Sequence, residues 1–210
     1  MSRPDPAIDA TAGSPLAGRR VIVGVTGGIA AYKAATLVSR LAQRGAEVAV
    51  CMTEAATRFI TPLTLQALSG RPVYTDQWTH VESSDPQHIA TARDADLAIV
   101  APCTMDFMAK LVTGRTDDVV ALVLSAIDRR QTPVLLAPSM NEVMWSQPST
   151  QRNAAQLTTD GFELVGPDDG WQACRAVGPG RMVEPEDLAH VVAERLGITT
   201  PGPSPSITRS

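Results

Sequence analysis

Short runs of β-branched and other apolar residues alternate along the chain with longer stretches in which apolar residues recur every three or four positions. The short runs predict strands, and the longer stretches predict amphipathic helices. The stretch AYKAATLVSRLAQRG, residues 31–45, has the helical spacing, because its apolar residues fall on one face. The predicted strands lie at 20–27, 47–53, 97–103, 133–140 and 163–167. This alternation predicts βαβ units.

The predicted strands are apolar almost throughout, so both of their faces are expected to be buried. We therefore predict an α/β fold, a single-domain Rossmann-like parallel sheet with helices on both faces. In open sheets of this kind, ligands bind at the carboxyl ends of the strands. Candidate site residues are consequently expected in the loops that follow the strands.

The length of 210 residues is enough for one domain with tails. Segments 1–18 and 198–210 are rich in proline and small residues and are predicted to be disordered, which leaves a domain at 19–197. The first segment lacks the basic start and apolar core of a signal peptide. No run reaches the roughly 18 uninterrupted apolar residues of a membrane span, so no membrane segment is expected.

The net charge of -4 and the pI near 5.3, without a Lys/Arg cluster, argue against a nucleic-acid or anionic-membrane partner. The three widely spaced cysteines predict neither a disulfide framework nor a metal site, and fit a reducing cytoplasm. Cys51 and Cys103 end apolar strands and are expected to be core thiols. Cys174 lies in the glycine- and proline-rich stretch 170–180, which predicts either a lid with a proton donor or nucleophile, or a simply exposed thiol.

The loops after the first three strands carry candidate ligand-binding groups. Glycines in GVTGGIAAYK, residues 24–33, suit either a phosphate cradle or a tight turn, and their spacing is not GxGxxG. Thr53 is expected at a helix N-cap, where capping alone is favoured over phosphate binding. No acidic residue stands in a clear ribose-binding position, which favours a mononucleotide such as FMN. In the third loop, Thr104 and Asp106 fit equally a helix cap and polar contacts to a ring system.

Asn141 is an isolated amide among Met140, Met144 and Trp145 in APSMNEVMW, residues 137–145. An amide satisfied by its own turn is the simplest interpretation of this stretch alone. Among the histidines, His80 and His190 are expected at the surface. His88 starts a short predicted helix before the third strand and is expected near the ligand-facing edge, with a helix-terminal histidine of no chemical role as the alternative.

Five segments occur in an order that resembles the homo-oligomeric flavin-containing cysteine decarboxylases, over about residues 19–190. They are GVTGGIAAYK, MTEAATRFITPLTLQALSG, HIATARDADLAIVAPCT, APSMNEVMW and QACRAVGPGRM. PxMNxxMW and the cysteine before GPGRM are the specific signals, whereas the glycine-rich loop is a weak one. The resemblance implies the flavoprotein fold, FMN as cofactor, and decarboxylation of 4′-phosphopantothenoylcysteine to 4′-phosphopantetheine in coenzyme A biosynthesis.

The resemblance also implies roles for individual residues. His88 matches the active-site histidine, Asn141 the amide that binds the substrate carboxylate, and Cys174 the thiol that returns a proton; Met144 and Arg181 are further expected substrate contacts. FMN contacts are expected from Gly27, Gly28, Ile29, Ala30, Thr53, Phe59, Thr104, Met105, Asp106 and Phe107. No metal is implied.

The chain departs from the bacterial pattern at two places. Arg175-Ala176 replaces Gly-Asp after the lid cysteine, and Asp117-Asp118 replaces Asn-Asp after the helix that follows the third strand. The resemblance further implies a homotrimer or homododecamer with FMN at subunit interfaces, where His88 and Asn141 reach one flavin from different chains. The synthetase that precedes this reaction, often fused in bacteria, is expected here as a separate protein.

The implied chemistry explains the need for a flavin. The cysteine nitrogen of this substrate is acylated, so a pyridoxal imine cannot form. Hydride transfer from Cβ to FMN gives a thioaldehyde β to the carboxylate, CO₂ loss leaves an enethiolate, and reduction returns the saturated thiol and the oxidised flavin. Three alternatives stay open: a lantibiotic-type peptidyl-cysteine decarboxylase, a flavin prenyltransferase, and a non-catalytic regulatory flavoprotein.

Overall fold

The computed structural model describes residues 14–78, 86–171 and 177–198. In these ranges a five-stranded sheet has the order β2-β1-β3-β4-β5, and every neighbouring pair of its strands is parallel. The strands are β1 (Arg20–Val25), β2 (Glu47–Met52), β3 (Leu97–Cys103), β4 (Val134–Pro138) and β5 (Glu163–Leu164). All five predicted strands are confirmed, and so is the α/β fold.

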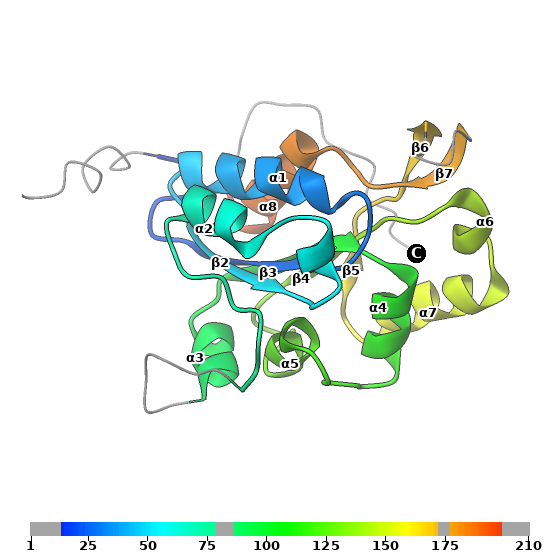
Figure 1. Cartoon of the computed structure of the whole chain (residues 1–210), viewed down its shortest axis with the longest axis horizontal. Coiled ribbons are helices and arrows are strands. Elements are labelled where there is room, and N and C mark those ends of the chain that lie inside the picture. The colour runs from blue at the N-terminus through cyan, green and yellow to red at the C-terminus, as the bar shows by residue number, and fades with distance from the viewer. Residues whose placement is uncertain (1–13, 79–85, 172–176, 199–210) are drawn as a thin grey trace, which may run out of the picture.

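Helices cover both faces of this sheet (Figure 1). One face carries α1 (Ala31–Gln43), α2 (Pro62–Ser69) and α8 (Pro185–Arg195), and the other carries α3 (Gln87–Arg93), α4 (Met105–Val112), α5 (Val119–Ser125) and α7 (Pro148–Thr159). The short helices η1 (Ala56–Arg58) and α6 (Glu142–Trp145) follow strand ends, and β6 (Asp168–Trp171) and β7 (Val177–Arg181) form a separate antiparallel hairpin. No helix in the described ranges is long and apolar enough to cross a membrane.

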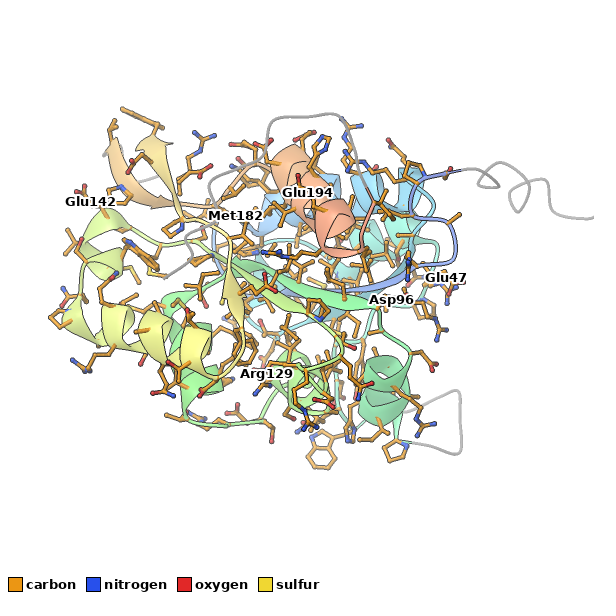
Figure 2. The ribbon with its side chains drawn as sticks, turned by 180° about the vertical axis from the view of Figure 1, so that it is seen from behind. Glu47, Asp96, Arg129, Glu142, Met182 and Glu194 are labelled. Carbon is orange, nitrogen blue, oxygen red and sulfur yellow. The ribbon has the colours of Figure 1, made fainter. Side chains whose placement is uncertain are left out.

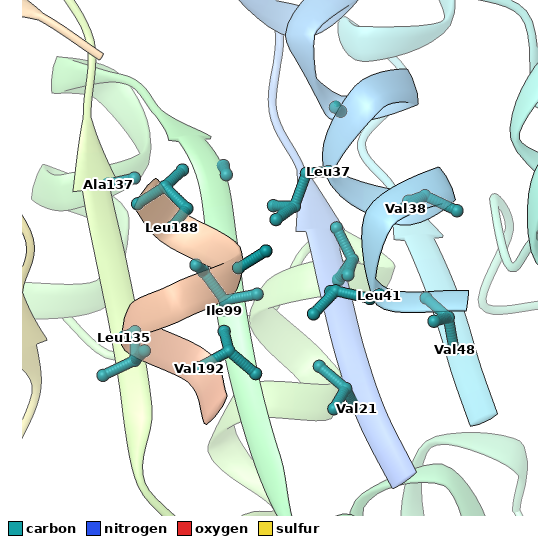
Figure 3. Packing of buried hydrophobic residues seen from close by; sticks show 14 of the residues in the cluster. Val21, Leu37, Val38, Leu41, Val48, Ile99, Leu135, Ala137, Leu188 and Val192 are labelled. Carbon is teal, nitrogen blue, oxygen red and sulfur yellow. The ribbon is translucent and has the colours of Figure 1, made fainter. Parts of the chain in front are cut away.

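The core forms two layers because successive side chains of each strand point to opposite faces. In Figure 3, Leu41 of α1 lies beside Val21 of β1, Leu37 lies farther along the same strand, and Val192 of α8 packs beside Ile99. All five side chains are fully buried, and burying a side chain of this kind contributes about 1.5–3 kcal/mol. The second layer lies against α5 and α4 and includes Ile22, Val100, Leu136, Val120 and Phe107. The predicted burial of the strands on both faces is confirmed for β1 to β4, whereas the two residues of the edge strand β5 are half-buried.

The N-terminal boundary lies earlier than predicted. Leu16 is fully buried in the first core layer, and its N–H donates to the carbonyl oxygen of Arg44 at 2.8 Å. The prediction of disorder up to residue 18 is therefore wrong for residues 14–18. One apolar side chain and one backbone hydrogen bond hold this otherwise small and polar segment on the domain.

The two ends of the sheet differ in chemistry. At the amino ends of the strands, Arg20 pairs with Glu47 and Asp94, and Arg19 pairs with Asp96. Figure 2 shows Glu47 and Asp96 at the end of the molecule opposite to Glu142. These exposed side chains are paired with one another, and such surface ion pairs contribute little to stability. The carboxyl end is left for a ligand.

Candidate active site

A cavity of about 1200 Å³ lies at the carboxyl ends of the strands. It is lined by the loops after β1, β2, β3 and β4, together with residues of the β6–β7 hairpin. In the observed strand order, the chain moves from β1 to β2 on one side and then crosses to β3 on the other side. This reversal is a topological switch point, where open α/β sheets bind their ligands.

The loop between β1 and α1 approaches the loop after β2 closely. A Cβ atom on Gly27 would stand 2.4 Å from the Cβ of Ala55 and 2.9 Å from its carbonyl carbon, so only glycine fits this approach. Ala30, the N-cap residue of α1, offers no side-chain acceptor to the first turn. The amino end of α1 thus lies at the cavity without a side-chain cap, which suits an anion such as a phosphate.

Threonines join the strand ends beneath the cavity. The hydroxyl of Thr26 donates to the carbonyl oxygen of Pro102 at 2.7 Å and accepts from the N–H of Thr104 at 3.2 Å. Thr104 in turn caps α4 by accepting from the N–H of Phe107, so the cap interpretation of Thr104 is confirmed. Thr26 is buried and was missed, because a threonine at the end of an apolar strand carries no local signal.

Thr53 differs from its expected position. Its hydroxyl accepts from the N–H of Ala56 at 3.2 Å, but the helix that follows is the single 3-10 turn η1, and its N-cap residue is Ala55. Thr53 is almost fully buried and still lines the cavity. Its hydroxyl therefore supports a turn that sets the cavity wall.

Asn141 is the N-cap of α6, and its Oδ1 accepts from the N–H of Val143 at 2.8 Å. The amide therefore serves its own turn and also lines the cavity. Because a backbone donor fixes which side of the amide is oxygen, the NH₂ group is the donating side. Met140 and Met144 line the cavity with it, whereas Trp145 packs against the core and does not line the cavity.

A charged cluster lies in the cavity wall, and the sequence singled out only its two aspartates. Lys110 of α4 forms ion pairs with Asp117 and Asp118, and Asp118 also caps α5 by accepting from the N–H of Ala121. Burial opposes the charge of Lys110, but hydrogen bonds to the two carboxylates outweigh burial and raise the pKa of this lysine. Lys110 is therefore a fixed cation. The Asp117 departure from the bacterial pattern belongs to this cluster.

A second charged cluster joins the start of α1 to the end of the hairpin. Glu184 accepts from Lys33 at 2.9 Å and also pairs with Arg181, and all three residues line the cavity. Burial lowers the pKa of Lys33. Burial also raises the pKa of Asp168, which is paired in register with Arg181.

The structure brings most of the predicted site residues together. The cavity lining contains all the predicted substrate contacts and all the predicted cofactor contacts but one; these are Gly27, Gly28, Ile29, Ala30, Thr53, Thr104, Met105, Asp106, Phe107, Asn141, Met144 and Arg181. Phe59 is half-exposed beside η1 and does not line the cavity. Cys174 lies outside the described residues.

His88 does not join this cavity within one chain. It lies in the first turn of α3, which Figure 1 places at the opposite end of the molecule from α6 and the hairpin. The expectation that it lies near the ligand-facing edge of its own sheet is therefore wrong. The helix that enters β3 reaches the sheet at the amino end of that strand, and its position follows from the sheet topology.

The interpretation of Cys51 and Cys103 as core thiols is confirmed, since both are fully buried.

Comparison with known sequences gives a consistent family. A family model described as Flavoprotein matches residues 10–197. The coenzyme A biosynthesis bifunctional protein CoaBC of Vibrio vulnificus (strain YJ016) is 47% identical over 173 residues, covering 82% of this chain and 42% of that protein. The protein of the same name from Bacillus subtilis (strain 168) is 43% identical over 185 residues, covering 88% and 45%. The chain spans less than half the length of these curated relatives.

Solved structures agree in fold. A PPC decarboxylase mutant complexed with pantothenoylaminoethenethiol superposes with a TM-score of 0.76 at 27% identity, covering 85% of this chain and 98% of that one. The FMN-dependent cysteine decarboxylase SpaF superposes with a TM-score of 0.71 at 29% identity and the same coverage. With the family model matching most of its length, the chain belongs to the Flavoprotein family.

Proposed function

We propose that the chain is an FMN-dependent decarboxylase that converts 4′-phosphopantothenoylcysteine to 4′-phosphopantetheine in coenzyme A biosynthesis. The observation that carries this proposal is the cavity at the switch point, which combines an uncapped helix start behind a glycine loop with the amide of Asn141. The printed names of the similar proteins, coenzyme A biosynthesis and PPC decarboxylase, support the substrate class.

The residues present fit FMN. The cavity exceeds the roughly 300–1,000 Å³ of ordinary small-molecule sites, which leaves room for a cofactor together with a substrate. The segment from Gly27 to Ala30 would hold the phosphate at the start of α1. Thr53 and the residues from Thr104 to Phe107 would contact the rest of the cofactor. Bound FMN would supply the reversible acceptance of a hydride that opens the substrate to decarboxylation.

The cap formed by Asn141 supports the role that we propose for its amide. With its oxygen engaged by Val143, the amide directs N–H donors and can orient a carboxylate. A neutral donor stabilises that carboxylate less than an arginine would, so less of the ground-state charge interaction is lost as CO₂ leaves. Cys174 stays the predicted source of the returning proton.

The substrate would also present a phosphate, which a peptide would not. Lys33 and Arg181 both line the cavity and share the carboxylate of Glu184. These two cations favour a substrate with an anionic end over an uncharged peptide. The similarity to SpaF keeps the peptidyl-cysteine reaction as the second candidate function.

We also propose that the site is completed by further copies of the chain, in a homotrimer or homododecamer. Ile29, Tyr32 and Trp171 line the cavity yet are each more than 60% exposed, and Met144 is 43% exposed. Apolar side chains gathered at a cavity mouth are typical of an interface. A neighbouring copy would cover them, and the predicted arrangement would bring its His88 to the same flavin. The synthetase that makes the cysteine amide is the expected pathway partner, in keeping with the bifunctional relatives.

The test is to purify the protein, record its visible spectrum, and follow CO₂ release from 4′-phosphopantothenoylcysteine and from a peptide ending in cysteine. We expect a flavin spectrum and CO₂ release from the phosphorylated substrate. The Asn141→Asp variant should keep its melting temperature, because aspartate is as good an N-cap as asparagine. It should lose activity by at least about 100-fold, because its charge repels the substrate carboxylate.

Other outcomes would reject parts of the proposal. Release of CO₂ from the peptide alone would favour the peptidyl-cysteine decarboxylase. A flavin-containing protein that releases CO₂ from neither substrate would favour the regulatory alternative. An Asn141→Asp variant with full activity would remove the role given to this amide.

A further inference from the structure

The β6–β7 hairpin stands outside the five-stranded sheet, next to α6 (Figure 1). A backbone hydrogen bond joins it to the strand-end segment before α6, since the N–H of Met140 donates to the carbonyl oxygen of Gly180 at 2.9 Å. This bond lies one residue from Asn141. The hairpin is thus attached to the segment that carries the proposed carboxylate-binding amide.

Glu142 forms a second point of attachment. A Cβ atom on Gly178 would stand 2.4 Å from Oε2 and 2.5 Å from Cδ of Glu142. The carboxyl group therefore occupies the space that any side chain at position 178 would need. Figure 2 shows Glu142 on the turn of α6 beside the hairpin. Glu142 itself does not line the cavity, although Asn141 directly before it does.

The hairpin transmits this contact to the cavity. Gly178 is paired with Gly170, and the next pair on one side is Val177 with Trp171. On the other side, Arg181 is paired with Asp168 beyond the Asp169–Pro179 pair and a register shift. Trp171 and Arg181 both line the cavity. Because paired strands move together, the positions of Gly178, Trp171 and Arg181 are linked through the hairpin.

We propose that Glu142 is a positioning residue, whose carboxyl group, seated on the side-chain-free backbone of Gly178, fixes the β6–β7 hairpin and thereby places Trp171 and Arg181 at the cavity. The effect on catalysis rests on the proposed function. The attachment itself does not. A glutamate side chain rotates more readily than a strand moves, so a methyl group at position 178 displaces the carboxylate and has the same consequence as its removal.

The attachment is tested by amide hydrogen exchange in the substrate-free protein, with peptides that cover the two hairpin strands. The variants are Glu142→Ala, Gly178→Ala and the two combined. Val143→Ala is the control, because its side chain is 63% exposed on the same turn and its N–H remains for the Asn141 cap. All four retain the cavity residues.

Each single variant should raise exchange in the hairpin about tenfold. The double variant should exceed either by less than about twofold, because both changes disrupt the same contact between the Glu142 carboxyl group and Gly178. The control should exchange as the wild type does. Wild-type exchange in Glu142→Ala, or single effects that multiply in the double variant, would overturn the proposal.

Activity gives the second readout. Glu142→Ala and Gly178→Ala should each lower kcat/KM about tenfold, mainly through a higher KM, since Trp171 and Arg181 then stand in several positions. The double variant should match the singles and Val143→Ala should match the wild type. A protein that shows the exchange pattern but decarboxylates no tested substrate would contradict the proposed function and keep the attachment.

Discussion

At the scale of single residues, two interpretations that compete in the sequence hold together in the structure. Asn141 satisfies its own turn and also lines the cavity, so a local capping role does not exclude a binding role. Thr104 likewise caps its own helix and lines the cavity. Both residues open helices at strand ends, where the donors of a helix start and a ligand lie on the same side. Local sequence therefore could not decide between the two roles.

The buried thiols give a prediction about pH. Burial raises the pKa of Cys51 to about 12 and also raises that of Cys103. Thiols in the unfolded chain titrate near pH ~8.5. Below that pH both states are protonated and the stabilisation is complete; as the pH rises further, the unfolded chain loses protons that the folded chain retains, so stability falls.

We expect a loss of about 1.4 kcal/mol for each thiol between pH ~7.5 and ~9.5. The variant Cys51→Ala/Cys103→Ala, which is less stable at both pH values, should lack this part of the loss. Urea unfolding under reducing conditions measures the difference. The same pH dependence in both proteins would show that these thiols do not titrate differently on unfolding.

At the scale of elements, strands and long helices followed from the hydrophobic pattern, but short elements did not. The β6–β7 hairpin arises from a stretch rich in glycine and proline, for which the sequence predicts a loop, either a lid or one with a simply exposed thiol. Its strands pair with each other away from the sheet. Gly170 has a φ of 153°, and a Cβ atom on this residue would meet the side chain of Arg181. The turn η1 replaces an expected helix. Such elements depend on the surfaces they rest on, and these surfaces come from distant parts of the chain.

The glycine loop gives a prediction at this scale. A methyl group at Gly27 meets Ala55 at 2.4 Å, whereas one at Gly28 meets only the methyl group of Thr104 at 3.2 Å. Gly27→Ala should therefore push the loop away from η1 and lower flavin content at least about tenfold, a loss of the size that one misplaced binding group causes. Gly28→Ala should retain more flavin. Absorbance ratios of the purified variants measure this, and equal flavin content in both would show that the close approach to Ala55 is not needed.

At the scale of the whole molecule, sheet order assembles the site and leaves His88 out of it. The order β2-β1-β3-β4-β5 brings loops from four strands to one edge, while α3 lies at the other end of the molecule. Apolar side chains at the cavity mouth are left exposed in the single chain. A homo-oligomer would resolve both features.

We therefore expect light scattering to give three or twelve times the chain mass of 22.2 kDa. Ile29→Glu should reduce the assembly and its flavin content together, because a charge buried at an interface is unfavourable. Arg152→Glu, on the exposed surface of α7 and outside the cavity lining, is the control. A monomer that binds flavin fully and decarboxylates the substrate would contradict the assembly.

The sequence by itself determined the strands, the burial of the central strands on both sheet faces and the family motifs, because each depends on residues near one another in the chain. Tertiary structure alone decided which loops meet. It joined Lys33 to Glu184 and buried Thr26 beneath the cavity. It also seated Glu142 on Gly178. These contacts link residues whose neighbours in sequence carry no sign of them, since they depend on strand order and on helices packing from opposite ends of the chain.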